Sequence, residues 1–354
     1  MAKVDLPTWA VHSTVAESPE IIYAFVAHYL NLGASEIHLC LDNPQDDIVA
    51  TLGGMDRVRL TICDEAYWAN SPDGRPDRIV PRQRYNATLS YRECQADWFL
   101  FCDADEYLYP ERPFAEILAE QLPRTGYRRL RMAERFQDLD HPEDDIFAGR
   151  FRCTMDDAEG VQAVYGDLAD LTTQGLTADV IGKSVIRTGL PYRIWIHFPI
   201  LPGENRETMR RHPSFRRPGF LESCWLAHFD GFTPLHWQVK LLRGVMGEPD
   251  ILDAASKKRT PARRRQMRMI YSMESHEAVA KAVEKLCGLT SEQIARLGEF
   301  GGLVPLDLAP SKAAQATFAS LALDYRRTTF DQRLAARYPD LTQGRVDAGT
   351  EPES

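Results

Sequence analysis

The sequence predicts an α/β protein in which a mainly parallel, Rossmann-like sheet is flanked by helices and followed by a helical C-terminal extension. Two observations predict this class: apolar strand-like runs alternate with helix-like segments over the first hundred residues, and the strand-like runs end in acidic residues. Strands that alternate with helices at this spacing form parallel sheets covered on both faces. With 354 residues, 44% of them apolar and 26% charged, the chain has the composition of a globular enzyme of one or two domains.

The first expected element is a strand at residues 8–15, followed by a helix whose two ends are marked in the sequence. Ser18 is the expected N-cap, Pro19 the first helical position and Gly33 the stop. Between these ends, apolar side chains recur at helical spacing and define one face. The remaining expected elements of this region are strands at 36–41 and 58–63, a helix at 82–96 and a strand at 98–102.

The pattern is weaker after residue 110. A strand is expected at 127–132 and several short strands within 182–200. Polar composition predicts loops at 137–145 and 156–160, and a stretch rich in Arg, Pro and Gly predicts a long loop at 203–219.

The predicted domain organisation has three parts. Residues 1–245 form the sheet-containing catalytic domain, 246–341 a helical extension and 342–354 a polar, disordered tail. The extension follows from the mostly helical pattern of residues 232–338, which breaks near Gly301.

The most informative stretch is WFLFCDADEYLY, residues 98–109. Its apolar start has the length and bulk of a buried strand, and carboxylates follow at Asp103, Asp105 and Glu106. Two residues apart in extended backbone, the two aspartates project to the same side, which is unfavourable unless a cation lies beside them. Hard carboxylate oxygens suit Mg²⁺ or Mn²⁺, which keep positions open for water and phosphate. The alternative is a strand that runs into a solvated acidic turn.

Polar residues also follow the other predicted strands of this region. They are Glu17, preceded by Ala16, after the first strand, Asp42 after the second and Asp64–Glu65 after the third. Ligands of parallel α/β sheets bind at the carboxyl ends of the strands. The sequence therefore predicts a binding site along this edge, together with Asp103.

The bulk composition argues against several classes of protein. There are 42 Lys and Arg against 51 Asp and Glu, and the resulting net charge of −9 argues against general nucleic-acid binding. The seven cysteines are scattered and include no Cys-x-x-Cys pair, which fits a reducing compartment. Neither a secretory signal nor an apolar run of about 20 residues is evident. We expect a cytoplasmic protein.

Two blocks of the chain resemble bacterial glycosyltransferases of the family-2 type, which use nucleotide sugars and have a GT-A fold. The blocks are AESPEIIYAFVAHYLNLGASEIHLCLDNPQDD (16–47) and RQRYNATLSYRECQADWFLFCDADEYLY (82–109), and weaker likenesses follow at GKSVIRTGL, IHFPI and AHFDGFTPLHWQVKLLRG. The helices beyond residue 250 match nothing in the family. One departure is that Asn43 and Pro44 follow Asp42, where relatives often carry further acid.

The resemblance implies a metal-dependent transfer of a sugar from a nucleotide diphosphate donor to a hydroxyl acceptor. It further implies inversion at the sugar carbon and a place in cell-surface glycan or polysaccharide synthesis. The cofactor would be Mn²⁺ or Mg²⁺, coordinated by Asp105 and His228, with Asp103 binding the metal or the donor ribose. Glu106 would orient the aspartates. The alternative for His228 is a buried histidine satisfied by the backbone.

The resemblance also suggests which residues face the nucleoside and which accept the acceptor proton. Ala16, Glu17 and Asp42 are expected at the nucleoside because the first two strands border the binding crevice. Their alternative is ordinary polar residues at strand ends. The candidates for the catalytic base are Glu134, after an expected strand, and Asp230, beside His228.

Helix residues are expected to complete the donor site. Gln83 and Asn86, one turn apart, would bracket the donor, and Arg82 or Arg84 would meet its phosphates. The alternative is a solvated helix face. Lys183 follows a glycine and would contact phosphate, unless it is an exposed lysine in a turn.

Two basic stretches stand out from the acidic background, at 210–218 and 257–268. They are either solvated faces or contacts for an anionic acceptor glycan or an anionic membrane surface. In the latter case the protein would be peripheral to the inner membrane face. His197, in an apolar run, is typical of a core histidine.

Two other functions remain open. A Mg²⁺-dependent phosphatase that resembles the haloacid dehalogenase group also has Asp-x-Asp after an apolar strand, but that group carries a Thr or Val where Tyr107 stands. A sugar-binding module would keep the fold without turnover, although intact Asp103 and Asp105 weigh against it. Hydrolysis of a nucleotide sugar in the absence of acceptor distinguishes the three.

Overall fold

The computed structural model describes residues 5–122, 125–204, 219–253, 256, 259–273 and 276–342. The chain divides into two compact units, each assembled from segments distant in sequence. The first comprises Met1–Met132, Ile181–His228 and Pro310–Leu323, and the second Ala133–Val180, Phe229–Ala309 and Asp324–Ser354. Segments of the two units alternate along the chain, whereas the sequence predicted consecutive domains with a boundary at residue 245. Apart from Thr342, the tail expected to be disordered lies outside the described residues.

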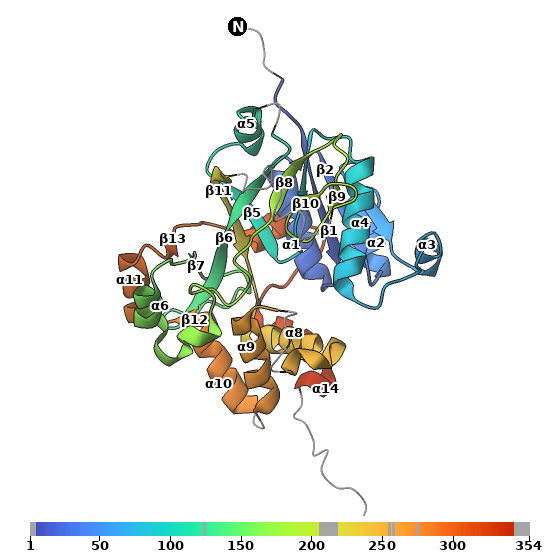
Figure 1. The fold of residues 1–354 in the computed structure, drawn as a ribbon. Helices are drawn as coiled ribbons and strands as arrows, with labels where there is room; N and C mark the ends of the chain where they lie inside the picture. The colour runs from blue at the N-terminus through green and yellow to red at the C-terminus, as the bar shows by residue number, and fades with distance from the viewer. Residues whose placement is uncertain are drawn as a thin grey trace, which may run out of the picture. The chain divides into compact units, whose positions relative to one another are not determined.

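The first unit is built on a sheet whose central strands are parallel, and the predicted α/β class is confirmed (Figure 1). Its parallel strands, in order across the sheet, are β3 (Val58–Ile62), β2 (Glu36–Leu41), β1 (Trp9–Val15) and β4 (Trp98–Phe101). β8 (Ser184–Arg187) pairs antiparallel with β4, and the start of β6 (Tyr127–Asp138) pairs antiparallel with β8. β1, β2 and β4 are buried at every position, and β4 accordingly has a continuous apolar sequence.

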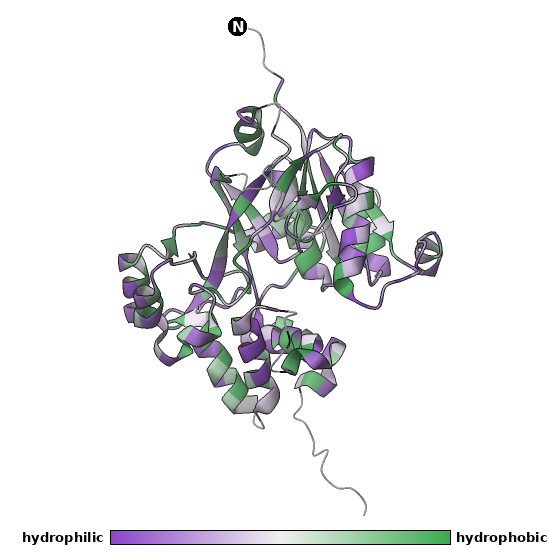
Figure 2. Ribbon diagram, viewed as in Figure 1, coloured by the Kyte–Doolittle hydropathy of each residue, from purple (hydrophilic) through white to green (hydrophobic). Residues whose placement is uncertain are grey.

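Helices cover both faces of this sheet. Those of the first unit are α1 (Pro19–Asn31), α2 (Asp46–Leu52), α3 (Glu65–Ala69), α4 (Ile79–Glu93), α5 (Phe114–Ala119) and α12 (Pro310–Thr317). Trp9 of β1 meets Tyr29 of α1, with ring centroids 6.2 Å apart, while the next strand residue, Ala10, packs with Ala87 and Tyr91 of α4. Because neighbouring strand residues point to opposite faces, α1 and α4 lie on opposite faces. Figure 2 shows α4 with hydrophobic and hydrophilic sides.

The helical pattern beyond residue 232 is confirmed, but one of its helices belongs to the first unit. α12 packs along α1, and the rings of Tyr23 and Phe318 have centroids 4.9 Å apart. No local signal in the sequence separates α12 from its neighbours, because the partner helix lies almost 300 residues earlier in the chain.

An antiparallel pair of strands carries residues of the candidate site. β5 (Glu106–Pro110) pairs with β11 (Phe220–His228), and in this register His228 stands opposite Glu106. β11 also pairs with β6. The sequence did not predict β11. The loop expected at 203–219 lies mostly outside the described residues, because 205–218 are not described.

The second unit combines short strands with most of the C-terminal helices. Its strands are the end of β6, β7 (Arg150–Arg152), β12 (Gly288–Leu289) and β13 (Leu303–Val304). Its helices are α6 (Ala158–Tyr165), α8 (Pro234–Gly247), α9 (Pro261–Ser272), α10 (His276–Cys287), α11 (Ser291–Glu299), α13 (Arg327–Arg337) and α14 (Pro339–Thr342), with 3₁₀ turns at Gly166–Leu171 and Pro249–Leu252. Trp237, Leu241, Ile270 and Val283 join α8, α9 and α10 in one apolar cluster.

The structure corrects the loop expected at 156–160. Asp157 is the N-cap of α6, and its carboxylate accepts a hydrogen bond from the backbone of Glu159 at 2.9 Å. Acidic residues that suggest a solvated loop are also favoured at helix N-termini, where they satisfy exposed N–H groups.

The structure describes most of the second basic stretch but not the first. Residues 210–218 lie outside the described part of the chain, as do 257–258. In α9, Arg263 bonds Asp230, and Arg268 donates to the backbone carbonyls of residues 252 and 253. These arginines therefore make contacts within the protein. Among the described residues, no helix has the length and apolar character needed to cross a membrane.

Candidate functional site

The candidate site lies in the first unit, where β4 ends and the chain turns into β5. The turn is closed by two hydrogen bonds between the same residues. The Glu106 N–H donates to the Asp103 carbonyl at 3.0 Å, and the Asp103 N–H donates to the Glu106 carboxylate at 2.8 Å. Glu106 is buried at 3% exposure, so it fixes the backbone that carries Asp103 and Asp105. The predicted orienting role of Glu106 matches this geometry.

Asp103 is held by two side chains from distant parts of the sequence. Its Oδ1 accepts from Gln83 of α4 at 2.7 Å, and its Oδ2 accepts from the Lys183 ammonium at 2.8 Å. The Asp103 side chain is 34% exposed, whereas that of Lys183 is 2% exposed. Asp103 therefore presents its remaining lone pairs to solvent from a fixed position.

Lys183 is a buried cation, so the alternative of an exposed turn lysine is wrong. Burial alone would lower its pKa, but the adjoining carboxylates of Asp103 and Glu106, the latter at 3.5 Å, raise the pKa above the ordinary value. Lys183 is thus charged at neutral pH. Burial raises the pKa of Glu106 to about 7, an effect that the Lys183 ammonium opposes.

The preceding turn explains why a glycine stands before Lys183. Gly182 has a φ of +70°, and a Cβ there would lie 2.3 Å from the carbonyl oxygen of Leu130. Nδ1 of His197 donates to the Gly182 carbonyl at 2.8 Å. His197 therefore supports the backbone that places Lys183, in agreement with its expected structural role.

Asp105 and His228 form the second part of the site. The antiparallel register of β5 and β11 brings His228 beside the turn, and its Nε2 lies 3.7 Å from Oδ2 of Asp105. Little of either side chain is exposed, 15% for Asp105 and 10% for His228. Two ligand atoms that each lie about 2.1 Å from one cation are about 3–4 Å apart. This pair therefore fits a single divalent cation.

Asp103 fits such a cation less directly, because Gln83 and Lys183 already hold both of its oxygens. In the described ranges, the donor atoms of Asp103, Asp105 and His228 do not all come within 4.8 Å of one another. The structure thus separates the predicted metal set into an adjacent Asp105–His228 pair and a neighbouring, tethered Asp103.

Asp42 lies at the end of β2, as predicted, and is 4% exposed. Arg82 of α4 and Arg75 bind its two carboxylate oxygens at 3.0 and 3.2 Å. Arg82 also donates to the carbonyls of Pro76 and Asp77, so its guanidinium organises this loop. Sequence reasoning missed Arg75, which lies in a polar turn without periodicity.

Asn86 is fully buried and joins three elements. It donates to Thr14 at 3.3 Å and to the Cys63 sulfur at 3.5 Å, and it accepts from the Tyr67 hydroxyl at 2.8 Å. Its contacts are therefore inside the protein, whereas Gln83, one turn earlier, reaches Asp103.

Ala16 and Glu17 follow β1 as predicted and are half-buried. The Glu17 carbonyl accepts from the Gln45 amide at 3.2 Å. Their expected place at the nucleoside stays a prediction.

Arg84, which with Arg82 was one of two candidates for the donor phosphates, stacks on an aromatic ring. Its guanidinium carbon lies 3.2 Å from the ring centroid of Trp195, in the segment between β9 (Arg193–Ile194) and β10 (Pro199–Ile200). Burial, and then the charge of Arg193, lower the pKa of Arg84 to about 10. The contact between Trp195 and Arg84 could not be predicted from the sequence, because it joins segments over 100 residues apart.

Glu134, a predicted base, is fully buried in the second unit. Its Oε1 accepts from Arg152 at 2.6 Å and from the Thr177 N–H at 2.8 Å, and its Oε2 accepts from the Ala178 N–H at 2.7 Å. The Glu134 and Arg152 side chains are 0% and 1% exposed. This geometry is that of a structural ion pair.

Asp230, the other predicted base, has a similar environment in the same unit. Its carboxylate accepts from Arg263 at 2.8 Å, from the Trp237 indole at 2.8 Å and from the Thr177 hydroxyl at 3.0 Å. The Asp230 side chain is 4% exposed. The catalytic assignments of Glu134 and Asp230 stay predictions.

Comparison with known proteins places few constraints on this chain. No protein-family model and no curated protein matches it. Solved structures with some likeness include HddC from Yersinia pseudotuberculosis, at 12% identity and a TM-score of 0.25, covering 40% of this chain and 61% of that one. Another is residues 1–349 of S. aureus TarS in complex with UDP, at 12% identity and a TM-score of 0.30, covering 73% of this chain and 69% of that one. These likenesses are too weak to support a statement about activity.

Proposed function

We propose that this chain is a metal-dependent glycosyltransferase of GT-A type, similar to family 2, which transfers a sugar from a nucleotide diphosphate donor to a hydroxyl acceptor with inversion. The supporting observation is that Asp105 pairs with His228 beside an Asp103 tethered by Lys183, all where a parallel strand ends. This edge of a parallel α/β sheet is where ligands bind. A place in cell-surface glycan or polysaccharide synthesis is part of the proposal.

In this mechanism Asp105 and His228 would hold Mn²⁺ or Mg²⁺ next to the donor diphosphate. When bound, the cation neutralises charge that develops on the leaving diphosphate. The tethered carboxylate of Asp103 either accepts hydrogen bonds from the donor ribose or joins the metal. Lys183 holds the Asp103 carboxylate in place, and its charge offsets part of the negative charge of the acidic turn.

The nucleoside lies along the ends of β1 and β2 in this proposal, near Ala16, Glu17 and Asp42. Arg75 and Arg82 fix Asp42, so its carboxylate is oriented before the donor binds. The acceptor hydroxyl gives its proton to a base, for which Glu134 and Asp230 stay the predicted candidates, although buried donors hold both carboxylates.

The test is hydrolysis of a panel of nucleotide sugars with Mn²⁺ and without acceptor. A transferase hydrolyses at least one donor slowly, a sugar-binding module hydrolyses none, and a phosphatase prefers phosphomonoesters. Asp105→Asn should lose the Mn²⁺-dependent reaction, while Asp56→Asn, at an exposed position of the same unit, should keep it. Equal turnover by the wild type and Asp105→Asn would remove the basis of the proposal.

A further inference from the structure

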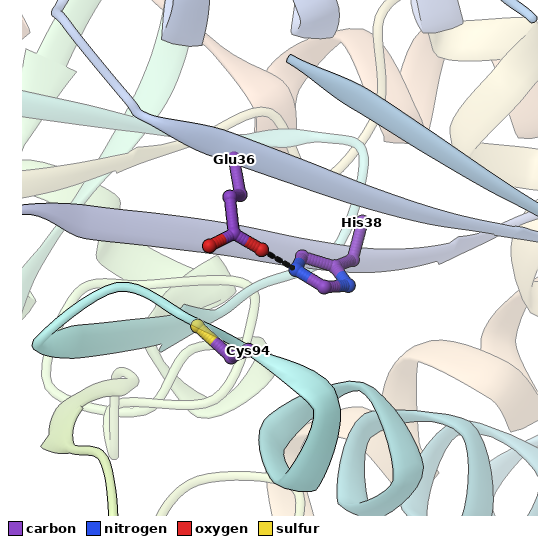
Figure 3. A group of neighbouring side chains, drawn as sticks. All are labelled: Glu36, His38 and Cys94. Atoms are coloured by element: carbon purple, nitrogen blue, oxygen red, sulfur yellow. Dashed lines mark hydrogen bonds and ion pairs between the residues drawn. The ribbon is translucent and has the colours of Figure 1, made fainter. Parts of the chain in front are cut away.

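A second group of metal-ligating side chains lies at the opposite end of β2 from the candidate site. Glu36 and His38 of β2 and Cys94, just after α4, place one donor atom each within 4.8 Å of one another (Figure 3). Among the described residues this is the single such group of three. Asp42 follows the other end of the same strand, roughly 20 Å away at the rise of an extended chain.

The backbone fixes the convergence of these three side chains. Glu36 and His38 are two residues apart in a strand, so they project to the same face of the sheet. Cys94 caps α4, where its N–H donates to the Ser90 carbonyl at 2.9 Å. The next N–H, of Gln95, donates to Oε1 of Glu36 at 3.0 Å and ties the helix end to the strand. The group is therefore organised before any ligand arrives.

The donor set has a definite chemical preference. A thiolate, an imidazole and a carboxylate are zinc ligands, and three protein ligands with a fourth position for water are a common zinc arrangement. The Asp105–His228 pair offers no sulfur donor, and Mg²⁺ and Mn²⁺ do not favour thiolate ligands. Glu36 and His38 are buried, at 7% and 4% exposure, and Cys94 is partly exposed and gives solvent access.

We propose that Glu36, His38 and Cys94 bind Zn²⁺ at a site separate from the Asp105–His228 pair. In the metal-free form, Oε2 of Glu36 accepts from Nε2 of His38 at 2.9 Å and from the exposed Arg59 at 3.0 Å. On binding, the thiol of Cys94 releases its proton to solvent, and the His38 proton moves from Nε2 to Nδ1. Arg59 turns into solvent as the dication takes over its neutralising role.

The experiment titrates the full chain, stripped of metal by a chelator, with Zn²⁺ in competition with a chromophoric indicator. Cd²⁺ then replaces Zn²⁺, because its charge-transfer absorption reports a thiolate ligand. We expect one Zn²⁺ per chain, a dissociation constant raised by about tenfold or more in Cys94→Ser and in His38→Gln, and loss of the Cd²⁺ band in Cys94→Ser.

Matched variants separate this site from the other possibilities. Cys63→Ser tests the neighbouring Cys63–Cys40 thiol pair, and Asp105→Asn tests the carboxylate site. Both should keep the wild-type Zn²⁺ affinity and the Cd²⁺ band. The proposal is overturned if the wild type binds no stoichiometric Zn²⁺, if Cys94→Ser and His38→Gln bind it as the wild type does, or if Cys63→Ser or Asp105→Asn abolishes binding.

Discussion

Replacing Glu134 by alanine tests whether this residue is a structural partner or a catalytic base. The substitution leaves the Arg152 guanidinium, in a side chain 1% exposed, without its counter-charge. Removing one partner of a buried ion pair costs about 3–5 kcal/mol. The Thr177 and Ala178 N–H groups also lose their acceptor, and each unsatisfied buried donor costs about 1–3 kcal/mol. We expect the free energy of unfolding to fall by at least about 4 kcal/mol.

The assay is urea unfolding followed by circular dichroism, with a matched substitution in the same unit. Glu143→Ala, at an exposed position, should stay within about 0.5 kcal/mol of the wild type. The double variant Glu134→Leu/Arg152→Met removes both charges and should be more stable than Glu134→Ala, because no buried charge is left unpaired. A Glu134→Ala protein with wild-type stability but without transfer activity would refute the structural role and support the catalytic one.

Three further predictions concern His28 and Gly182 of the first unit. Burial lowers the pKa of His28 from 6.5 to about 4, so between these pH values the unfolded chain binds a proton that the folded protein excludes. The free energy of unfolding should therefore fall by about 3 kcal/mol as the pH falls from 6.5 to 4. The urea midpoints of the wild type and His28→Gln should diverge in this range, whereas those of His141→Gln, at an exposed position, should follow the wild type. A Cβ on Gly182 would clash with the Leu130 carbonyl, so Gly182→Ala should lower the melting temperature. Gly189 has a similar φ of +75° but open space around it, so Gly189→Ala should lower the melting temperature less. Equal losses in the two variants would show that the backbone angle φ alone matters. Gly182→Ala should also lower donor hydrolysis, because it displaces the turn before the buried lysine, while Gly189→Ala should not.

The fold was predictable where burial on both faces leaves a continuous apolar run. Trp98–Phe101 has this pattern, and the helix between Ser18 and Gly33 is marked at both ends. β11 was not predictable, because FLESCWLAH follows an Arg- and Pro-rich stretch and its partner strand lies over 100 residues earlier. Non-local pairing leaves no local signal in the sequence.

The candidate site likewise has residues with a local signal in the sequence and residues without one. Asp103 and Asp105 were visible because their spacing and the strand before them are local features. The tether from Lys183 spans 80 residues, and the burial of this lysine excludes the alternative of an exposed turn lysine. Asn86 and Gln83 were both expected at the donor. Helix periodicity alone does not show that Asn86, one turn after Gln83, is covered by Thr14 and Tyr67.

Thermal stabilisation by nucleoside diphosphates, measured with and without Mn²⁺, tests the central claim most directly. A ligand at 100 times its dissociation constant stabilises the native state by about 2.7 kcal/mol. We predict that at least one of a panel including UDP and GDP stabilises the wild type only when Mn²⁺ is present. Asp105→Asn and His228→Ala should each lose that shift. Stabilisation of both variants equal to that of the wild type, or no shift with any nucleotide and Mn²⁺, would contradict a metal–diphosphate site at the end of β4.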